Sequence, residues 1–130
     1  MVVQITVQGD GRESQWVKPL EGTPAEREEA GHAKGKEVGR VISEAALNEA
    51  ATEVRHPSCC GRRMEIRGRR AIMVQGVDGP LRIRRTRYRC RTCGHERTPA
   101  DSRQTCGRHR LTRPLAKQAC QLATVEHFPF

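Results

Sequence analysis

Residues 79–94 read GPLRIRRTRYRCRTCG, an arginine-rich run that ends in two cysteines and a glycine. Residues 81–88 alternate with the period of two that is typical of a β-strand. One face of this strand carries Leu81, Ile83, Arg85 and Arg87, and the other carries Arg82, Arg84, Thr86 and Tyr88. Upstream, Ile66 and residues 71–74 (AIMV) favour a preceding strand, and residues 76–80 (GVDGP) favour a turn between the two. The sequence therefore predicts a β-hairpin with an arginine-rich surface.

The end of this run, Cys90-Arg91-Thr92-Cys93-Gly94, has the spacing of half a zinc site. Two thiolates separated by two residues and followed by glycine can form a turn whose backbone amides point at the sulfurs. A redox dithiol is the alternative, but such motifs usually belong to a strand–helix unit, and this one follows an arginine-rich strand. We therefore expect zinc as a cofactor, with Cys90 and Cys93 as two of its ligands.

The remaining ligands can come from two places. Upstream, the sequence HPSCCG offers His56, Cys59 and Cys60. The two thiols are adjacent there, so His56 with either cysteine is an alternative to the cysteine pair. Downstream, Cys106 and His109 would complete a Cys-x2-Cys-x12-Cys-x2-His pattern. We favour the upstream set, because it places the hairpin between two cysteine turns, as in a zinc ribbon.

Charge divides the chain into unlike segments. Residues 1–54 carry six Lys and Arg against ten acidic residues, residues 55–114 carry seventeen Arg against four, and residues 115–130 are balanced. The middle segment is thus +13 in a chain of net +9. Guanidinium groups suit phosphate, so we expect a nucleic acid partner, preferably DNA. The arginines expected to meet phosphates are Arg69, Arg70, Arg82, Arg84, Arg85, Arg87, Arg89 and Arg91.

The composition limits what the chain can be. Of its 130 residues, 35% are hydrophobic and 3% aromatic, too few for one large apolar core. A stable fold then needs a metal or a partner chain, which can be a second copy. No apolar stretch approaches the roughly 18 residues of a membrane span, and the start of the chain lacks the order of a signal peptide. We expect a cytoplasmic protein with no membrane partner.

The pattern predicts a small α+β protein in three parts. The first part is residues 1–54. It is expected to hold a strand at 2–8, a turn at 9–11 and a polar connection at 12–23. A short helix from Thr23-Pro24, weakened by Gly31 and Gly35, should follow, and then an amphipathic helix over about 38–53. Residues 55–104 form the zinc-ribbon-like hairpin, followed by a loop after Cys93. Residues 105–130 form a C-terminal helix that begins near 112–114, with Cys120 on its apolar side and therefore in the core.

The sequence shows neither a pair of acidic residues spaced for catalysis nor a phosphate-binding loop. Asp78 lies in a predicted turn, and Glu96 and Asp101 are isolated among arginines, so no pair of carboxylates is placed for general acid–base work. The Gly9-Asp10-Gly11 stretch lacks the further glycines and the lysine of a phosphate loop. We expect no catalysis and assign no catalytic residue.

The order of these features resembles the N-terminal region of insertion-sequence transposases of the Kra group. In that family a cysteine turn, a strand similar to residues 79–90 (GPLRIRRTRYRC), a second cysteine turn and a segment similar to residues 99–102 (PADS) follow one another. The resemblance covers residues 55–101. It departs at HPSCCG, where the family keeps two residues between the thiols, and the chain ends before the acidic catalytic domain.

This resemblance implies a truncated transposase, or a separately encoded N-terminal module, that binds transposon-end DNA without cutting it. Two alternatives belong to other classes of function. One is a protein-interaction or dimerisation module, in which the acidic helix around 37–53 and the apolar C-terminal helix are docking surfaces. The other is a non-functional transposase remnant.

Overall fold

The computed structural model describes residues 1–9, 12–105 and 110–126, which form a mixed α and β fold with small antiparallel sheets. This confirms the predicted mixture of helices and strands. Strands β1 and β2 form one sheet, β3 and β4 a second, and β5, β6 and β7 a third. The elements are β1 (Val2–Gly9), β2 (Arg12–Pro19), α1 (Pro24–Thr52), β3 (Ser58–Cys59), β4 (Arg62–Arg63), β5 (Glu65–Gly76), β6 (Gly79–Arg89), β7 (Glu96–Arg97), α2 (Pro99–Gln104) and α3 (Arg113–Glu126).

The predicted hairpin is the β5–β6 pair, and its alternation places the core. Val74 lies opposite Leu81, and Ile72 lies opposite Ile83. Val74, Leu81 and Ile83 are at most 2% exposed, and they form the core with Ala51 of α1 and Ala100 of α2. Because side chains alternate along a strand, the face that carries Leu81 and Ile83 is buried, and the face that carries Arg82 and Arg84 is exposed.

Helix α1 begins where the sequence predicts and runs without interruption through the two helices that were expected. The Thr23 hydroxyl accepts a hydrogen bond from the Glu26 amide at 3.2 Å, and the Glu26 carboxylate accepts one from the Thr23 amide at 2.9 Å. This capping box satisfies two free amides of the first turn. The expectation of two helices was wrong: Gly31 and Gly35 lie inside one helix, because a glycine costs a helix only about 1 kcal/mol.

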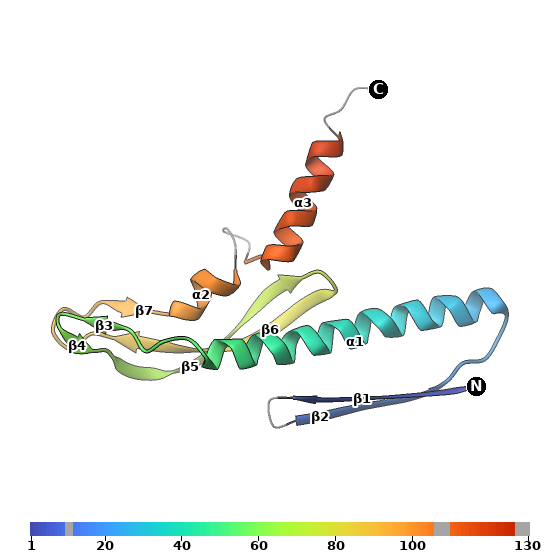
Figure 1. The fold of residues 1–130 in the computed structure, drawn as a ribbon, viewed down its shortest axis with the longest axis horizontal. Helices are drawn as coiled ribbons and strands as arrows, with labels where there is room; N and C mark the ends of the chain where they lie inside the picture. The colour runs from blue at the N-terminus through green and yellow to red at the C-terminus, as the bar shows by residue number, and fades with distance from the viewer. Residues whose placement is uncertain (10–11, 106–109, 127–130) are drawn as a thin grey trace.

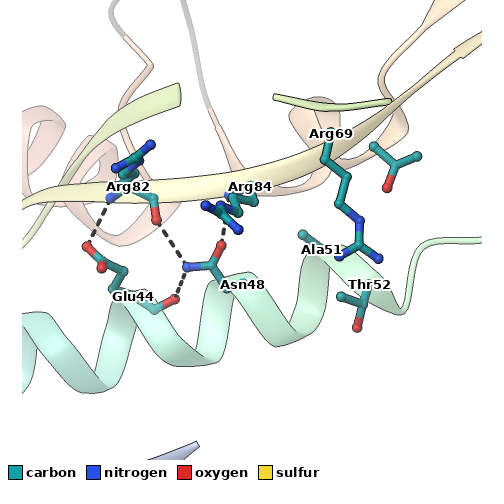
Figure 2. Close-up of a pocket in the computed structure, with 8 residues that line it drawn as sticks. Glu44, Asn48, Ala51, Thr52, Arg69, Arg82 and Arg84 are labelled. Atoms are coloured by element: carbon teal, nitrogen blue, oxygen red, sulfur yellow. Dashed lines mark hydrogen bonds between the residues drawn. The ribbon is translucent and has the colours of Figure 1, made fainter. Parts of the chain in front are cut away.

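Helix α1 also completes one edge of the β5–β6 sheet (Figure 2). The Asn48 amide oxygen accepts from the Arg84 backbone N–H at 2.8 Å, and its amide nitrogen donates to the Arg82 carbonyl at 3.0 Å. The Glu44 carboxylate accepts from the Arg82 backbone N–H at 3.0 Å. Two helical side chains thus stand in for the backbone of a neighbouring strand, which satisfies polar groups that an edge strand otherwise leaves open.

The N-terminal hairpin lies on the opposite side of α1 from β5–β6 (Figure 1). The polar connection expected over residues 12–23 was a wrong prediction, since residues 12–19 form β2 and pair with β1 in full register. Cross-strand pairing with a β-branched partner outweighs the polar composition of β2. The Trp16 indole N–H donates to the Glu37 carboxylate at 2.8 Å and fastens the hairpin to α1. A hydrogen bond from Lys34, together with this one from Trp16, lowers the pKa of Glu37.

The chain after the second cysteine turn is more ordered than predicted. In place of a loop, β7 pairs with the end of β6, and α2 packs against the same strand. Residues 110–112 then run beside β5, where the Gln75 amide donates to the Arg110 carbonyl at 3.0 Å. Helix α3 begins at Arg113, as expected, and projects away from the sheets (Figure 1). None of the described helices is long and apolar enough to span a membrane.

Cys120 does not lie in the core, as the sequence had suggested. It is exposed on α3. The reason is tertiary: α3 projects away from the sheets (Figure 1), so residues 117–123 are exposed, including the apolar Leu122 at 66%. An apolar stripe on a helix predicts burial only where another element covers that stripe.

Candidate metal centre and arginine groove

Four cysteines come together at the end of the hairpin that is remote from its turn. The sulfurs of Cys59, Cys60, Cys90 and Cys93 all lie within 4.8 Å of one another and could hold a metal ion. The Sγ atoms of Cys59 and Cys93 are 3.6 Å apart, and those of Cys59 and Cys60 are 3.8 Å apart. A tetrahedral zinc ion with Zn–S bonds of about 2.3 Å requires sulfurs about 3.8 Å apart. The two Sγ–Sγ distances of 3.6 and 3.8 Å fit this requirement.

The adjacent thiols are brought to one side by a tight turn. Cys59 pairs with Arg62 across β3 and β4, so Cys60 and Gly61 are the two loop residues of a hairpin. Both have positive φ, 53° at Cys60 and 74° at Gly61, as a type I′ hairpin turn requires. The neighbouring thiols that looked awkward for one ion in the sequence therefore converge.

The second cysteine turn follows the predicted geometry. The Gly94 amide donates to the Cys90 carbonyl at 3.0 Å, and Gly94 takes a φ of 73°, which favours glycine. The Cys90 amide donates to the His95 carbonyl at 2.8 Å, which closes the turn between β6 and β7. Cys90 is buried and Cys93 is exposed, so the pair reaches from the interior of the protein to its surface.

The sulfurs differ in their affinity for protons. Backbone N–H groups of Cys93 and Thr92 donate to the Cys90 sulfur and lower the pKa of Cys90 to about 6, against the effect of burial. Hydrogen bonds with Cys93, Cys90 and Cys60 raise the pKa of Cys59 to about 12. The pKa of Cys60 is also raised, chiefly through Cys93. At neutral pH Cys90 therefore offers a thiolate to an arriving cation, and Cys59 must release a proton to bind it.

The other predicted ligands lie elsewhere or outside the described residues. The ring Nε2 of His56 donates to the Met64 carbonyl at 2.6 Å, and the ring packs edge-on against Tyr88 with centroids 4.7 Å apart. His56 is not among the four clustered ligands. The downstream candidates, Cys106 and His109, fall in residues 106–109, which lie outside the described part of the chain.

Three of the predicted arginines surround one cavity on the exposed face of the hairpin. Arg69 of β5 and Arg82 and Arg84 of β6 line a cavity of about 360 Å³ between the sheet and α1. We call this cavity, with these three arginines, the arginine groove. Figure 2 shows the Arg69 side chain extending from β5 toward the end of α1, where the helix dipole favours a cation. Thr86 and Thr52 also line the groove, and Glu44 and Asn48 form its helical side.

The other predicted arginines have different surroundings. Arg85 is only 9% exposed and forms an ion pair with Asp101, so its assignment to the phosphate-binding surface was wrong. The alternation that placed Arg85 beside Leu81 and Ile83 puts it on the buried face. Arg87 pairs with Glu96 at 3.5 Å, and Arg91 pairs with Glu65 at 3.3 Å.

Arg70 and Arg89 are exposed, and Arg89 borders the cysteine turn of β6. Arg67, which is not among the predicted arginines, lines the same cavity beside Cys90 and Cys93. A register shift between Ile66 and Gly68 brings Arg67 there, and Gly68, with a φ of 116°, was the signal in the sequence for this irregularity.

Glu44 and Asn48 were also missed, since nothing in a helical pattern marks a contact with a distant strand edge.

A scan against protein-family models and searches of the curated proteins and of the solved structures each found no match to this chain.

Proposed function

We propose that the four cysteines bind one structural zinc ion and that residues 55–104 are a zinc-ribbon-like module. Thiolate sulfur is a ligand that zinc prefers, and four thiolates fill a tetrahedral shell. A filled shell leaves no position for water or substrate, so the ion stabilises the fold and does not activate a nucleophile. Zinc would join β3–β4 to the end of β6, where the described residues have few buried apolar side chains.

We further propose that the chain binds nucleic acid, preferably DNA, through the arginine groove. The observation that carries this proposal is the distribution of ion pairs. The acidic residues Glu65, Glu96 and Asp101 pair with arginines outside the groove. No ion pair between described residues involves Arg69, Arg82 or Arg84. The Glu44 carboxylate borders the groove, but it accepts from Arg40 and from the Arg82 backbone. Three guanidinium groups on one exposed face are suited to successive phosphates.

The resemblance to the N-terminal region of Kra-group transposases supports a narrower proposal for the partner. On that basis the DNA is a transposon end, and the chain binds it without cutting it. Phosphate contacts give register and affinity but little sequence specificity. We therefore expect the groove to contribute mainly a salt-dependent affinity that is shared by unrelated duplexes.

Binding to a DNA duplex over a range of salt concentrations tests the groove. Each phosphate contact contributes about 0.9 to the slope of log K against log salt. The double variant Arg82→Gln/Arg84→Gln should therefore bind more weakly and lose about 1.8 from the slope. The control Arg27→Gln/Lys36→Gln removes the same charge from α1, far from the groove in the sequence, and should keep the slope. An unchanged slope in the groove variant would remove these arginines from the proposal.

A protein-interaction module is the second candidate, and one observation favours it. Helix α3 exposes Leu122 on a segment that projects from the body (Figure 1). A chain that associates with other proteins but shows no salt-dependent DNA binding would fit this candidate, and a chain that does neither would fit a transposase remnant.

A further inference from the structure

The outer edge of β1 lacks the features that keep edge strands from pairing. The first sheet contains only β1 and β2, so among the described residues neither outer edge has a neighbouring strand. Residues 2–9 (VVQITVQG) carry no charge and no proline. Strand β2, by contrast, carries Arg12, Glu13, Lys18 and Pro19. Charged residues and proline are the usual protection of an exposed edge, so β2 is protected and β1 is open.

The hydrogen bonds of the hairpin show which backbone groups of β1 are free to pair. The Leu20 amide donates to the carbonyl of Met1, its opposite residue, at 2.8 Å. Directly opposed residues in an antiparallel pair alternate between bonded and non-bonded. The odd residues of β1 therefore bond to β2, and the N–H and C=O groups of the even residues point outward. The even residues are Val2, Gln4, Thr6 and Gln8.

The sequence of β1 is self-complementary about Ile5. In an antiparallel pairing of two copies centred on Ile5, Val3 lies opposite Val7, Gln4 opposite Thr6, and Val2 opposite Gln8. Apolar residues then meet apolar residues on the face that packs toward α1, where Val3, Ile5 and Val7 are half-buried. The even residues, which have outward backbone groups, become the hydrogen-bonded pairs, as this register requires. A two-fold axis through the Ile5 pair relates the two chains.

We propose that the protein forms a homodimer by antiparallel pairing of β1 with β1 of a second copy, which gives a continuous four-stranded sheet. The partner is a second copy of this chain, because the outer edge of β1 is complementary to the same edge of another copy both in the pattern of apolar residues and in charge. No like charges lie opposite each other in this register, since neither strand carries any. Each dimer carries two arginine grooves. The dimer itself does not depend on nucleic acid binding.

Sedimentation velocity of the full chain, without nucleic acid and over about a hundredfold range of concentration, tests the dimer. The wild type should shift from one chain to two as concentration rises. In Gln4→Lys/Thr6→Lys, each new lysine faces a lysine of the partner copy, so the transition should move to at least tenfold higher concentration. The matched control is Val17→Lys/Gln15→Lys. These residues are the β2 partners of Gln4 and Thr6, so the control adds the same charges to the same face and should dimerise like the wild type.

Thr6→Pro tests the same edge without adding charge. The Thr6 N–H points outward, so proline removes no hydrogen bond to β2 but blocks pairing with a second copy. We expect a folded monomer with an unchanged circular dichroism spectrum. A wild type that stays one chain at every concentration would overturn the proposal. So would a dimer that survives both β1 changes, or a loss of dimer in the β2 control equal to that in the β1 variant.

Discussion

The two long hairpins of this protein both lie against α1, yet they differ in how completely the helix covers them. Hairpin β5–β6 buries Val74, Leu81 and Ile83, and α1 closes its edge with Glu44 and Asn48. In β1–β2 none of the side chains described is fully buried, and Trp16 is fastened to the helix by one hydrogen bond to Glu37. Helix α1 therefore contributes to the core of β5–β6 and closes one edge of that hairpin, whereas it covers only part of β1–β2.

The two hairpins are therefore expected to differ in local stability. Hairpin β5–β6 combines an apolar face, a closed edge and a cysteine cluster at one end, so several independent interactions hold it in one register. Hairpin β1–β2 depends on its own ladder and on a half-buried face. Local opening should therefore require less free energy in β1–β2 than in β5–β6.

Removing one cysteine of the cluster should have the largest effect on this contrast. If the four cysteines bind zinc as proposed, Cys93→Ser should abolish metal binding and destabilise β5–β6 by several kcal/mol, because metal binding and folding of such sites are coupled. At about 4 °C per kcal/mol for a chain of this size, Tm should fall well beyond 10 °C. Metal content by mass spectrometry and thermal unfolding measure both effects. Cys120→Ser, at an exposed cysteine outside the cluster, should change neither.

Breaking the buried ion pair should be the next largest change. Asp101→Asn leaves the Arg85 guanidinium buried without a counter-charge, where it already has an Nη1 atom with no hydrogen-bond partner. A fully buried pair broken in this way costs about 3–5 kcal/mol, and Asp101 is partly exposed, so we expect about 2 kcal/mol in urea unfolding. Glu96→Gln breaks the more exposed pair with Arg87 and should cost less than about 1 kcal/mol. Equal costs would contradict the assignment of Arg85 to the buried face.

Opening the covered edge should make β6 more like β1. Asn48→Ala removes the partners of the Arg84 N–H and the Arg82 carbonyl, at a site that water can partly reach. We expect a loss of about 1–2 kcal/mol and faster amide hydrogen exchange at Arg84. Ala46→Gly provides a comparison, since it weakens an exposed position of the same helix by about 1 kcal/mol without touching the edge. If that variant accelerates exchange at Arg84 equally, the edge contact has no special role.

Two glycines of α1 give the smallest and most local contrast. A Cβ at Gly35 meets nothing within 4 Å, whereas one at Gly39 would lie 2.7 Å from a carboxylate oxygen of Asp78 in the β5–β6 turn. Gly35→Ala should stabilise the protein by up to about 1 kcal/mol. Gly39→Ala should gain less, because Asp78 must move. Asp78→Ala combined with Gly39→Ala should restore the missing gain in thermal unfolding, and an equal gain at both glycines without it would contradict the close approach.

Part of the fold and of the site was predictable because its signals are local. The alternation of residues 81–88 predicted the two faces of β6, and the Cys90–Gly94 spacing predicted the second cysteine turn. The Thr23 cap predicted the start of α1. In each case the deciding residues lie within one turn or one strand of each other, so periodicity and spacing suffice. Strand β2 was missed because its structure comes from the partner strand and not from its own composition.

The sequence by itself determined the arginine-rich strand, its alternating faces and two of the clustered thiols. The sequence favoured the upstream cysteines and His56 as partners of Cys90 and Cys93, and the tertiary structure decided that both Cys59 and Cys60 join them and that His56 does not. The tertiary structure alone decided that Asp101 pairs with Arg85, and that Glu44 and Asn48 close the edge of β6. The physical reason is separation along the chain. Cys59 lies 34 residues from Cys93, and Asn48 lies 36 residues from Arg84. Contacts at such distances arise only when packing brings the elements together, and a local pattern does not encode them.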